Sequence, residues 1–101
     1  MAETLDYDSF AEVLNTSFQI QINPDQTVDA ELVDISERLV SKVQDRFAVI
    51  FRISNDVLLG QGIHDFHHDR MGDFKLFISA VGRDEEGTSY EAVFNRMIKK
   101  H

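Results

Sequence analysis

The sequence has no cysteine, no tryptophan and a single proline among its 101 residues. Without cysteine, the chain can form neither a disulfide nor a thiolate metal site. Basic side chains are also scarce, because 10 lysines and arginines stand against 18 aspartates and glutamates and leave a formal net charge of -8. Nucleic acids and anionic membranes are bound through clusters of positive charge. We therefore expect neither a nucleic acid nor a membrane among the partners of this acidic chain.

Long hydrophobic runs are absent as well. No apolar stretch approaches the roughly 20 residues that a membrane-spanning helix needs. Residues 1–6 contain neither the basic region nor the apolar region of a secretory signal peptide. These absences, together with the lack of cysteine, predict a bacterial protein of the cytoplasm. The length predicts a single domain that spans residues 1–101.

The sequence is rich in short runs in which apolar and polar residues alternate. Residues two apart along a strand share one face, so each run builds one apolar wall. The clearest run places Phe47, Val49, Phe51 and Ile53 opposite Ala48, Ile50 and Arg52. A second run places Phe74, Leu76, Ile78 and Ala80 opposite Lys75, Phe77, Ser79 and Val81. Both patterns predict strands with one face in a hydrophobic core.

Together with these two runs, the remaining runs and the turn residues between them predict about six strands. These strands span roughly residues 18–22, 28–35, 46–53, 63–68, 73–81 and 89–95. Residues 23–25 form the first turn, because proline and its polar neighbours favour one. Loops at residues 69–72 and 83–87 each end on a glycine that supplies the left-handed position of a hairpin.

Residues 29–43 allow two interpretations. The apolar phase slips at Leu32 and Val33, which predicts a bulge in a strand. A helix is the alternative, because Leu32, Ile35 and Leu39 also fit a helical period. We favour a strand as far as Ile35, a turn at residues 36–38 and the start of another strand. The choice between helix and strand stays open for residues 36–45.

The first segment has a different period, which indicates a short helix. Its apolar positions are Leu5, Phe10, Val13 and Leu14. Asp6 or Asp8 can cap its start, and residues 9–12 match a capping box. We expect residues 57–59 to fill one end of the core and Met97 and Ile98 to cover the other. The chain as a whole predicts a mostly β protein, a small antiparallel β-barrel or β-roll with an N-terminal helix.

The one local cluster of reactive side chains lies at residues 64–69. Histidine is a common metal ligand, so His64, His67 and His68 are weak candidates for the site of a metal-dependent enzyme. A metal site needs three or four converging ligands, and this segment cannot supply them alone. We favour a polar strand end. The serines form no nucleophile motif, so we predict no catalytic residue, no cofactor and no enzyme activity.

Two other groupings are possible on opposite faces of the predicted sheet. Arg52 and Glu91 are polar residues within apolar runs and can form a cross-strand pair. Phe51, Phe66, Phe77 and Phe94 can enclose a small apolar ligand within the barrel. Small barrels are usually filled by their own side chains, so the ligand-binding barrel is our second hypothesis.

Strand and turn motifs carry a resemblance along most of the chain. They are residues 47–52, residues 59–62 with the histidine-bearing strand after them, residues 72–82, residues 90–95, and the spacing of Phe10, Leu14 and Phe18. In these motifs the chain resembles a family of small bacterial proteins, a domain of unknown function loosely associated with phage-tail-collar-like proteins. The resemblance implies a non-enzymatic accessory or assembly role with another protein as partner, and it transfers no functional residue.

Overall fold

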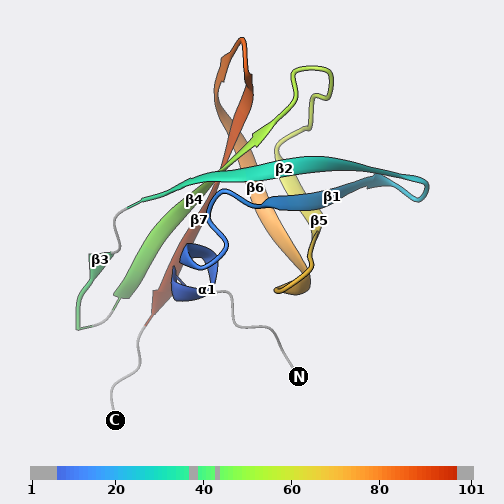
Figure 1. Ribbon diagram of the computed structural model, residues 1–101. Coiled ribbons are helices and arrows are strands. Elements are labelled where there is room, and N and C mark those ends of the chain that lie inside the picture. The colour runs from blue at the N-terminus through green and yellow to red at the C-terminus, as the bar shows by residue number, and fades with distance from the viewer. Residues whose placement is uncertain (1–6, 37–38, 43, 98–101) are drawn as a thin grey trace.

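A computed structural model describes residues 7–36, 39–42 and 44–97 of the chain. Within these residues one short helix precedes seven strands (Figure 1). In chain order they are α1 (Tyr7–Ala11), β1 (Ser17–Asn23), β2 (Gln26–Ile35), β3 (Leu39–Val40), β4 (Gln44–Ile53), β5 (Gly62–His68), β6 (Gly72–Asp84) and β7 (Gly87–Met97). The prediction of a mostly β chain with an N-terminal helix is confirmed.

Six of these strands close into an antiparallel barrel. Neighbours around the barrel follow the order β1-β2-β4-β7-β6-β5, and β5 pairs back with β1. β3 lies outside this ring and pairs with the start of β4. Closure gives each of the six strands a hydrogen-bonded neighbour on both sides over at least part of its length. The predicted barrel of about six strands is therefore confirmed.

The strand β6 is shared between two neighbours, and α1 lies where they diverge. Its first half pairs with β5, whereas its pairing with β7 begins only at Ser79 opposite Glu91. The Phe10 side chain of α1 is fully buried. Its ring centroid lies 6.3 Å from that of Phe74 on β6 and 5.3 Å from that of Phe94 on β7. The helix therefore fills the barrel end that these two strands leave open.

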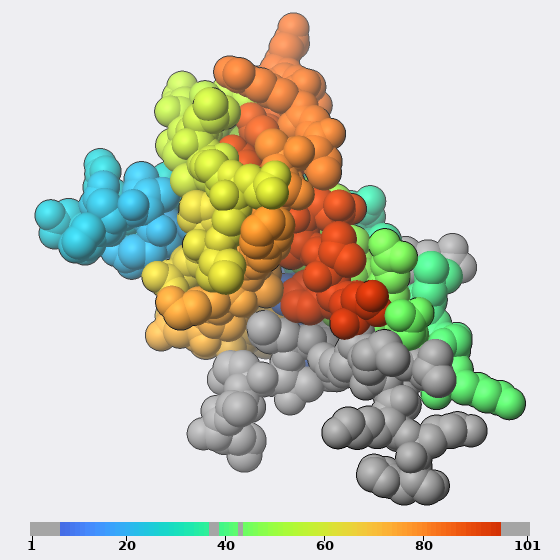
Figure 2. Space-filling view, turned by 180° about the vertical axis from the view of Figure 1, so that it is seen from behind, coloured from blue at the N-terminus to red at the C-terminus, as the bar shows by residue number. Residues whose placement is uncertain are grey.

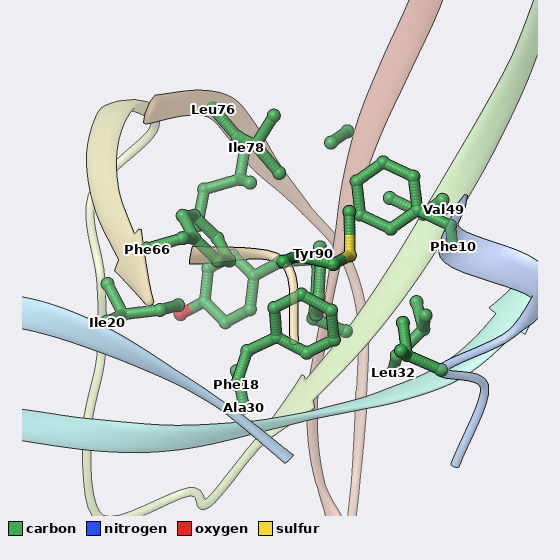
Figure 3. Close-up of a cluster of buried hydrophobic side chains, with 14 of the residues drawn as sticks. Phe10, Phe18, Ile20, Ala30, Leu32, Val49, Phe66, Leu76, Ile78 and Tyr90 are labelled. Carbon is green, nitrogen blue, oxygen red and sulfur yellow. The ribbon is translucent and has the colours of Figure 1, made fainter. Parts of the chain in front are cut away.

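The core consists of the inward residues that the alternation predicted. Phe47, Val49, Phe51 and Ile53 are all buried along β4. Figure 3 shows the Tyr90 ring of β7 among the side chains of Phe18 and Ile20 from β1 and of Phe66 from β5. Full burial of one such aromatic side chain contributes about 1.5–3 kcal/mol to stability. The predicted inner faces are confirmed except at Ala80, which was expected inside and is exposed, and at Ala48, which was expected outside and is buried.

Two glycines make the tight hairpins at the ends of β6. Gly72 has a φ of 80°, the left-handed conformation that was predicted for it. Gly87 has a φ of 154°, and a Cβ atom placed on it would lie 2.6 Å from the carbonyl oxygen of Ile53. The second loop is shorter than predicted, because β6 continues to Asp84 and pairs it with Gly87.

A strand and a helix were both considered for residues 29–43. The described part of this segment is extended, so the alternative helix is wrong. Residues 29–35 belong to β2, and the register between β2 and β4 shifts between Leu32 and Asp34. That shift confirms the predicted bulge. Leu39 and Val40 form the further strand β3. Residues 37 and 38 of the predicted turn, and Val43, lie outside the described part of the chain.

Three details at the ends of the barrel differ from expectation. Ser9 lies inside α1 and therefore cannot act as its cap, so the predicted capping box is wrong. Leu14 follows the end of the helix and is 39% exposed. Val57 and Leu59 pack against the core as expected, but Leu58 between them is 73% exposed. Leu5, Asp6, the Met97 side chain and Ile98, which were also given roles, lie outside the described part.

Candidate functional site

The histidine segment of β5 places its three histidines on two sides of the barrel wall. His64 and His68 alternate inward with Phe66, whereas His67 points outward. Nε2 of His64 lies 2.8 Å from the carbonyl oxygen of Gly60. A carbonyl can only accept, so this nitrogen carries the proton and donates. His64 therefore stabilises the bend that leads into β5.

His68 joins the hairpin after β5 to the segment after α1. Its Nδ1 accepts a 3.0 Å hydrogen bond from the backbone N–H of Arg70. Its Nε2 lies 2.9 Å from Oγ1 of Thr16, and that hydroxyl donates its single hydrogen to the carbonyl of Val13 at 2.6 Å. Nε2 must therefore donate. Burial lowers the pKa of His68 below its ordinary value of 6.5, which favours the neutral ring that this network requires.

His67 contacts carboxylates on the outer surface. Its Nδ1 lies 2.5 Å from Oδ1 of Asp73, and its Nε2 lies 3.7 Å from Oδ1 of Asp69. The three histidines thus have separate partners and do not converge. Nowhere in the described part of the chain do three or more His, Asp or Glu side chains gather as they would around a metal ion.

The four phenylalanines of the proposed apolar pocket are not brought together either. Phe51 and Phe66 are buried, with ring centroids 5.0 Å apart, and Phe94 stacks on Phe47 at 4.8 Å. Phe77 occupies the opposite face of β6 and is 54% exposed. Its inclusion in an internal pocket is therefore wrong. The other three rings pack against protein side chains within the core.

A groove of about 870 Å³ lies beside the β1–β2 hairpin. Its lining includes three side-chain amides of β1, those of Gln19, Gln21 and Asn23, and outward side chains of β5 and β6. Asp65 lies 2.5 Å from Nζ of Lys75, and Asp73 bonds to His67. Both carboxylates thus already have a basic neighbour within the groove. The lining indicates no particular class of ligand.

The outer wall of the barrel carries an apolar patch. We define the outer apolar patch as Ile63 on β5, Phe77 on β6 and Val93 on β7, which are 68%, 54% and 50% exposed. Ile63 and Phe77 are direct cross-strand partners. Phe77 and Val93 each lie two residues from the pair Ser79–Glu91, at which the β6–β7 ladder ends. Figure 2 shows β5, β6 and β7, in yellow, orange and red, side by side on this face.

Charged side chains flank the outer apolar patch, and their sign differs between its two sides. Toward one side, Glu91 on β7 and Asp34 on β2 both lie opposite Ile50 of β4. Toward the other side lies Arg46 on β4, opposite Asn95. One flank is therefore acidic and the other contains a cation. An apolar centre with a charged rim is the usual composition of a protein–protein interface.

The expected pair between Arg52 and Glu91 is wrong. The β4–β7 register places Arg52 opposite Ser89 and places Glu91 opposite Ile50. Nη1 of Arg52 instead lies 3.4 Å from the carboxylate of Glu86 in the β6–β7 hairpin. Glu91 is thus available to the rim of the outer apolar patch.

The sequence contained a signal for this patch that was not followed. Phe77 occupies the phase of its strand in which Lys75 and Ser79 point to solvent, and Ile63 alternates with buried Phe66 in the same way. Apolar residues in the outward phase of two successive strands can be recognised from the sequence. Their gathering into one surface depends on β5, β6 and β7 being neighbours.

Fold and surface together define a small closed antiparallel barrel with an exposed apolar patch on its outer wall. The chain belongs to the family described as Domain of unknown function (DUF6916), whose profile matches residues 5–94. Neither the curated proteins nor the solved structures include a significant match. Across residues 7–36, 39–42 and 44–97, the structure contains no helix with the length and hydropathy that a bilayer crossing requires.

Proposed function

We propose that this chain is a non-enzymatic protein-interaction or assembly module that contacts its partner through the outer apolar patch. The observation that supports the proposal is the exposure of three large apolar side chains on three neighbouring strands. One face of an antiparallel sheet ordinarily packs on the core while the other meets water and is polar. Contiguous apolar surface on a solvated wall is typical of an interaction site.

The composition of the patch fits this role. Aromatic residues near the centre of an interface contribute a large share of binding energy, and Phe77 lies between Ile63 and the β7 strand. The resemblance to a family associated with phage-tail-collar-like proteins favours an accessory role in a tail-like assembly. We also propose that the protein is cytoplasmic.

Site-specific photo-crosslinking in the native host tests this function. A photoreactive phenylalanine analogue replaces Phe77 in one variant and Leu58 in the control, since Leu58 is 73% exposed but lies in the loop before β5. We expect light-dependent protein adducts from position 77 and markedly fewer from position 58. Equal yields from both positions, or no adduct at position 77, would contradict the proposal.

A further inference from the structure

The charges that flank the outer apolar patch are arranged so that the surface is complementary to itself. The patch residues follow one another across β5, β6 and β7 in a row, in which Ile63 pairs with Phe77, and Phe77 and Val93 each lie two residues beyond the last β6–β7 pair. Ala48 of β4 is buried and pairs with Val93, which places β4 next to the end of this row. Along β4, Arg46 lies two residues before Ala48, and Ile50 lies two residues after it. Glu91 and Asp34 lie on either side of Ile50.

We propose that a second copy of this chain binds the outer apolar patch about a two-fold axis parallel to this row. The inference rests on the proposed function and names the partner. A two-fold axis in this direction maps each strand onto itself and exchanges the two flanks of the patch. Ile63, Phe77 and Val93 then meet their counterparts in the other copy, which is the self-complementary contact of an isologous dimer.

The same rotation brings opposite charges together at the rim. It places Arg46 of one copy over Ile50 of the other, between Glu91 and Asp34 of that copy. The contact forms twice, once on each side of the axis, and both contacts lie over β4. Complementary rim charges set the orientation of two apolar surfaces more than they add affinity. The cation and the two carboxylates therefore specify the two-fold arrangement, and the apolar patch supplies the contact.

The net charge of -8 does not prevent this association. At physiological ionic strength the Debye length is about 8 Å, so charges far from the contact are largely screened. Pairs within the contact lose water and are screened much less. The acidic loops and hairpins far from the contact therefore oppose the dimer only weakly.

Sedimentation equilibrium of the full chain tests the apolar part of the inference. We expect the wild type to dimerise and Phe77→Glu to raise the dimer dissociation constant by at least about tenfold, as loss of a central aromatic does. Leu58→Glu is the matched control and should leave the constant unchanged. Both side chains are more than half exposed, so circular dichroism should show both variants folded.

A charge-reversal cycle tests the orientation. Arg46→Glu and Glu91→Arg should each weaken the dimer, and the double variant should recover most of the loss, because the reversed charges again meet across the two-fold axis. A double variant no tighter than either single variant would overturn this orientation. A dimer whose dissociation constant is unchanged by Phe77→Glu would show that the outer apolar patch is not the dimer interface.

The inference and the proposed function fail in different ways. A wild-type chain that is monomeric up to about 1 mM would show that a second copy does not bind the outer apolar patch. If position 77 then still crosslinks to a different protein, the interaction function stands with another partner. If position 77 crosslinks to nothing, both proposals fail.

Discussion

The backbone N–H of Leu59 donates a 2.9 Å hydrogen bond to the hydroxyl oxygen of Tyr90, a residue with no exposed surface. Tyr90 lies on β7, and Leu59 lies in the connection from β4 to β5. This connection crosses one end of the barrel, and the bond holds it against the core. The aromatic ring fills the interior while its hydroxyl satisfies a backbone donor, so one side chain stabilises both parts.

Tyr90→Phe should therefore destabilise the protein even though it keeps the ring. Loss of the hydroxyl leaves the Leu59 N–H without its acceptor, which costs about 1–2 kcal/mol. Urea unfolding measures the change, and an unchanged m-value would show that the barrel itself is intact. Faster hydrogen exchange at the Leu59 amide should accompany it. An unchanged midpoint with unchanged exchange would show that the bond contributes nothing.

Stability should fall as the pH is lowered because of His68. Burial lowers its folded pKa below the ordinary 6.5, so the unfolded chain binds more protons between the two values. The neutral ring thus contributes stability that is fully present above pH 6.5 and is lost as the pH falls through 6.5 toward the folded pKa. Protonation would also turn Nδ1 from an acceptor into a donor facing the Arg70 N–H.

Chemical denaturation at a series of pH values measures this dependence. The His68→Gln variant has no titrating group at this position. We therefore expect its free energy of unfolding to be lower than that of the wild type at pH 8 and to vary less between pH 8 and pH 5. Identical slopes for the two proteins would show that His68 is not the group responsible.

The two faces of the wall can be distinguished by truncation. Phe51→Ala removes a fully buried ring and should cost about 3–5 kcal/mol. Lys75→Ala removes an exposed ion pair with Asp65 and should cost less than about 0.5 kcal/mol. Thermal and urea unfolding give both values. The reverse order would mean that the inner and outer faces have been exchanged.

The glycine at the β6–β7 hairpin should tolerate no side chain. Gly87→Ala places a Cβ atom 2.6 Å from the carbonyl oxygen of Ile53 at a φ of 154°, and such strain costs about 1–3 kcal/mol. Gly82→Ala on the same hairpin is the control, because a Cβ atom there has nothing within 4 Å. We expect the control to change stability by less than about 0.5 kcal/mol. Equal effects at both positions would contradict the close approach at Gly87.

Local patterns in the sequence were sufficient for most of the strands and for most of their inward residues. The two-residue period placed Phe51 in the core and Lys75 in solvent, and the phase slip at Leu32 located the bulge. These features depend on neighbours in the chain, which the sequence displays directly. The pairing of β5 with β1 joins residues more than forty positions apart, as in Gln19 with His67, and no local pattern specifies it.

The candidate surface was harder to predict for the same reason. Phe77 was included among the rings of an internal pocket, although its phase along β6 points outward. Arg52 and Glu91 were expected to pair because both interrupt apolar runs. In the register between β4 and β7, however, the pair Phe51–Tyr90 lies between them. Register and strand neighbours decide which outward residues form one surface, and both are properties of the whole barrel.

The most direct test of the interaction surface is a dilution series followed by methyl NMR. The side chains of Ile63 and Val93 should shift with protein concentration, because they leave water when two copies meet. The Leu58 methyls lie in the connection before β5 and should stay constant. Concentration-independent spectra at all three residues, or shifts confined to Leu58, would contradict the assignment of the outer apolar patch as the contact between copies.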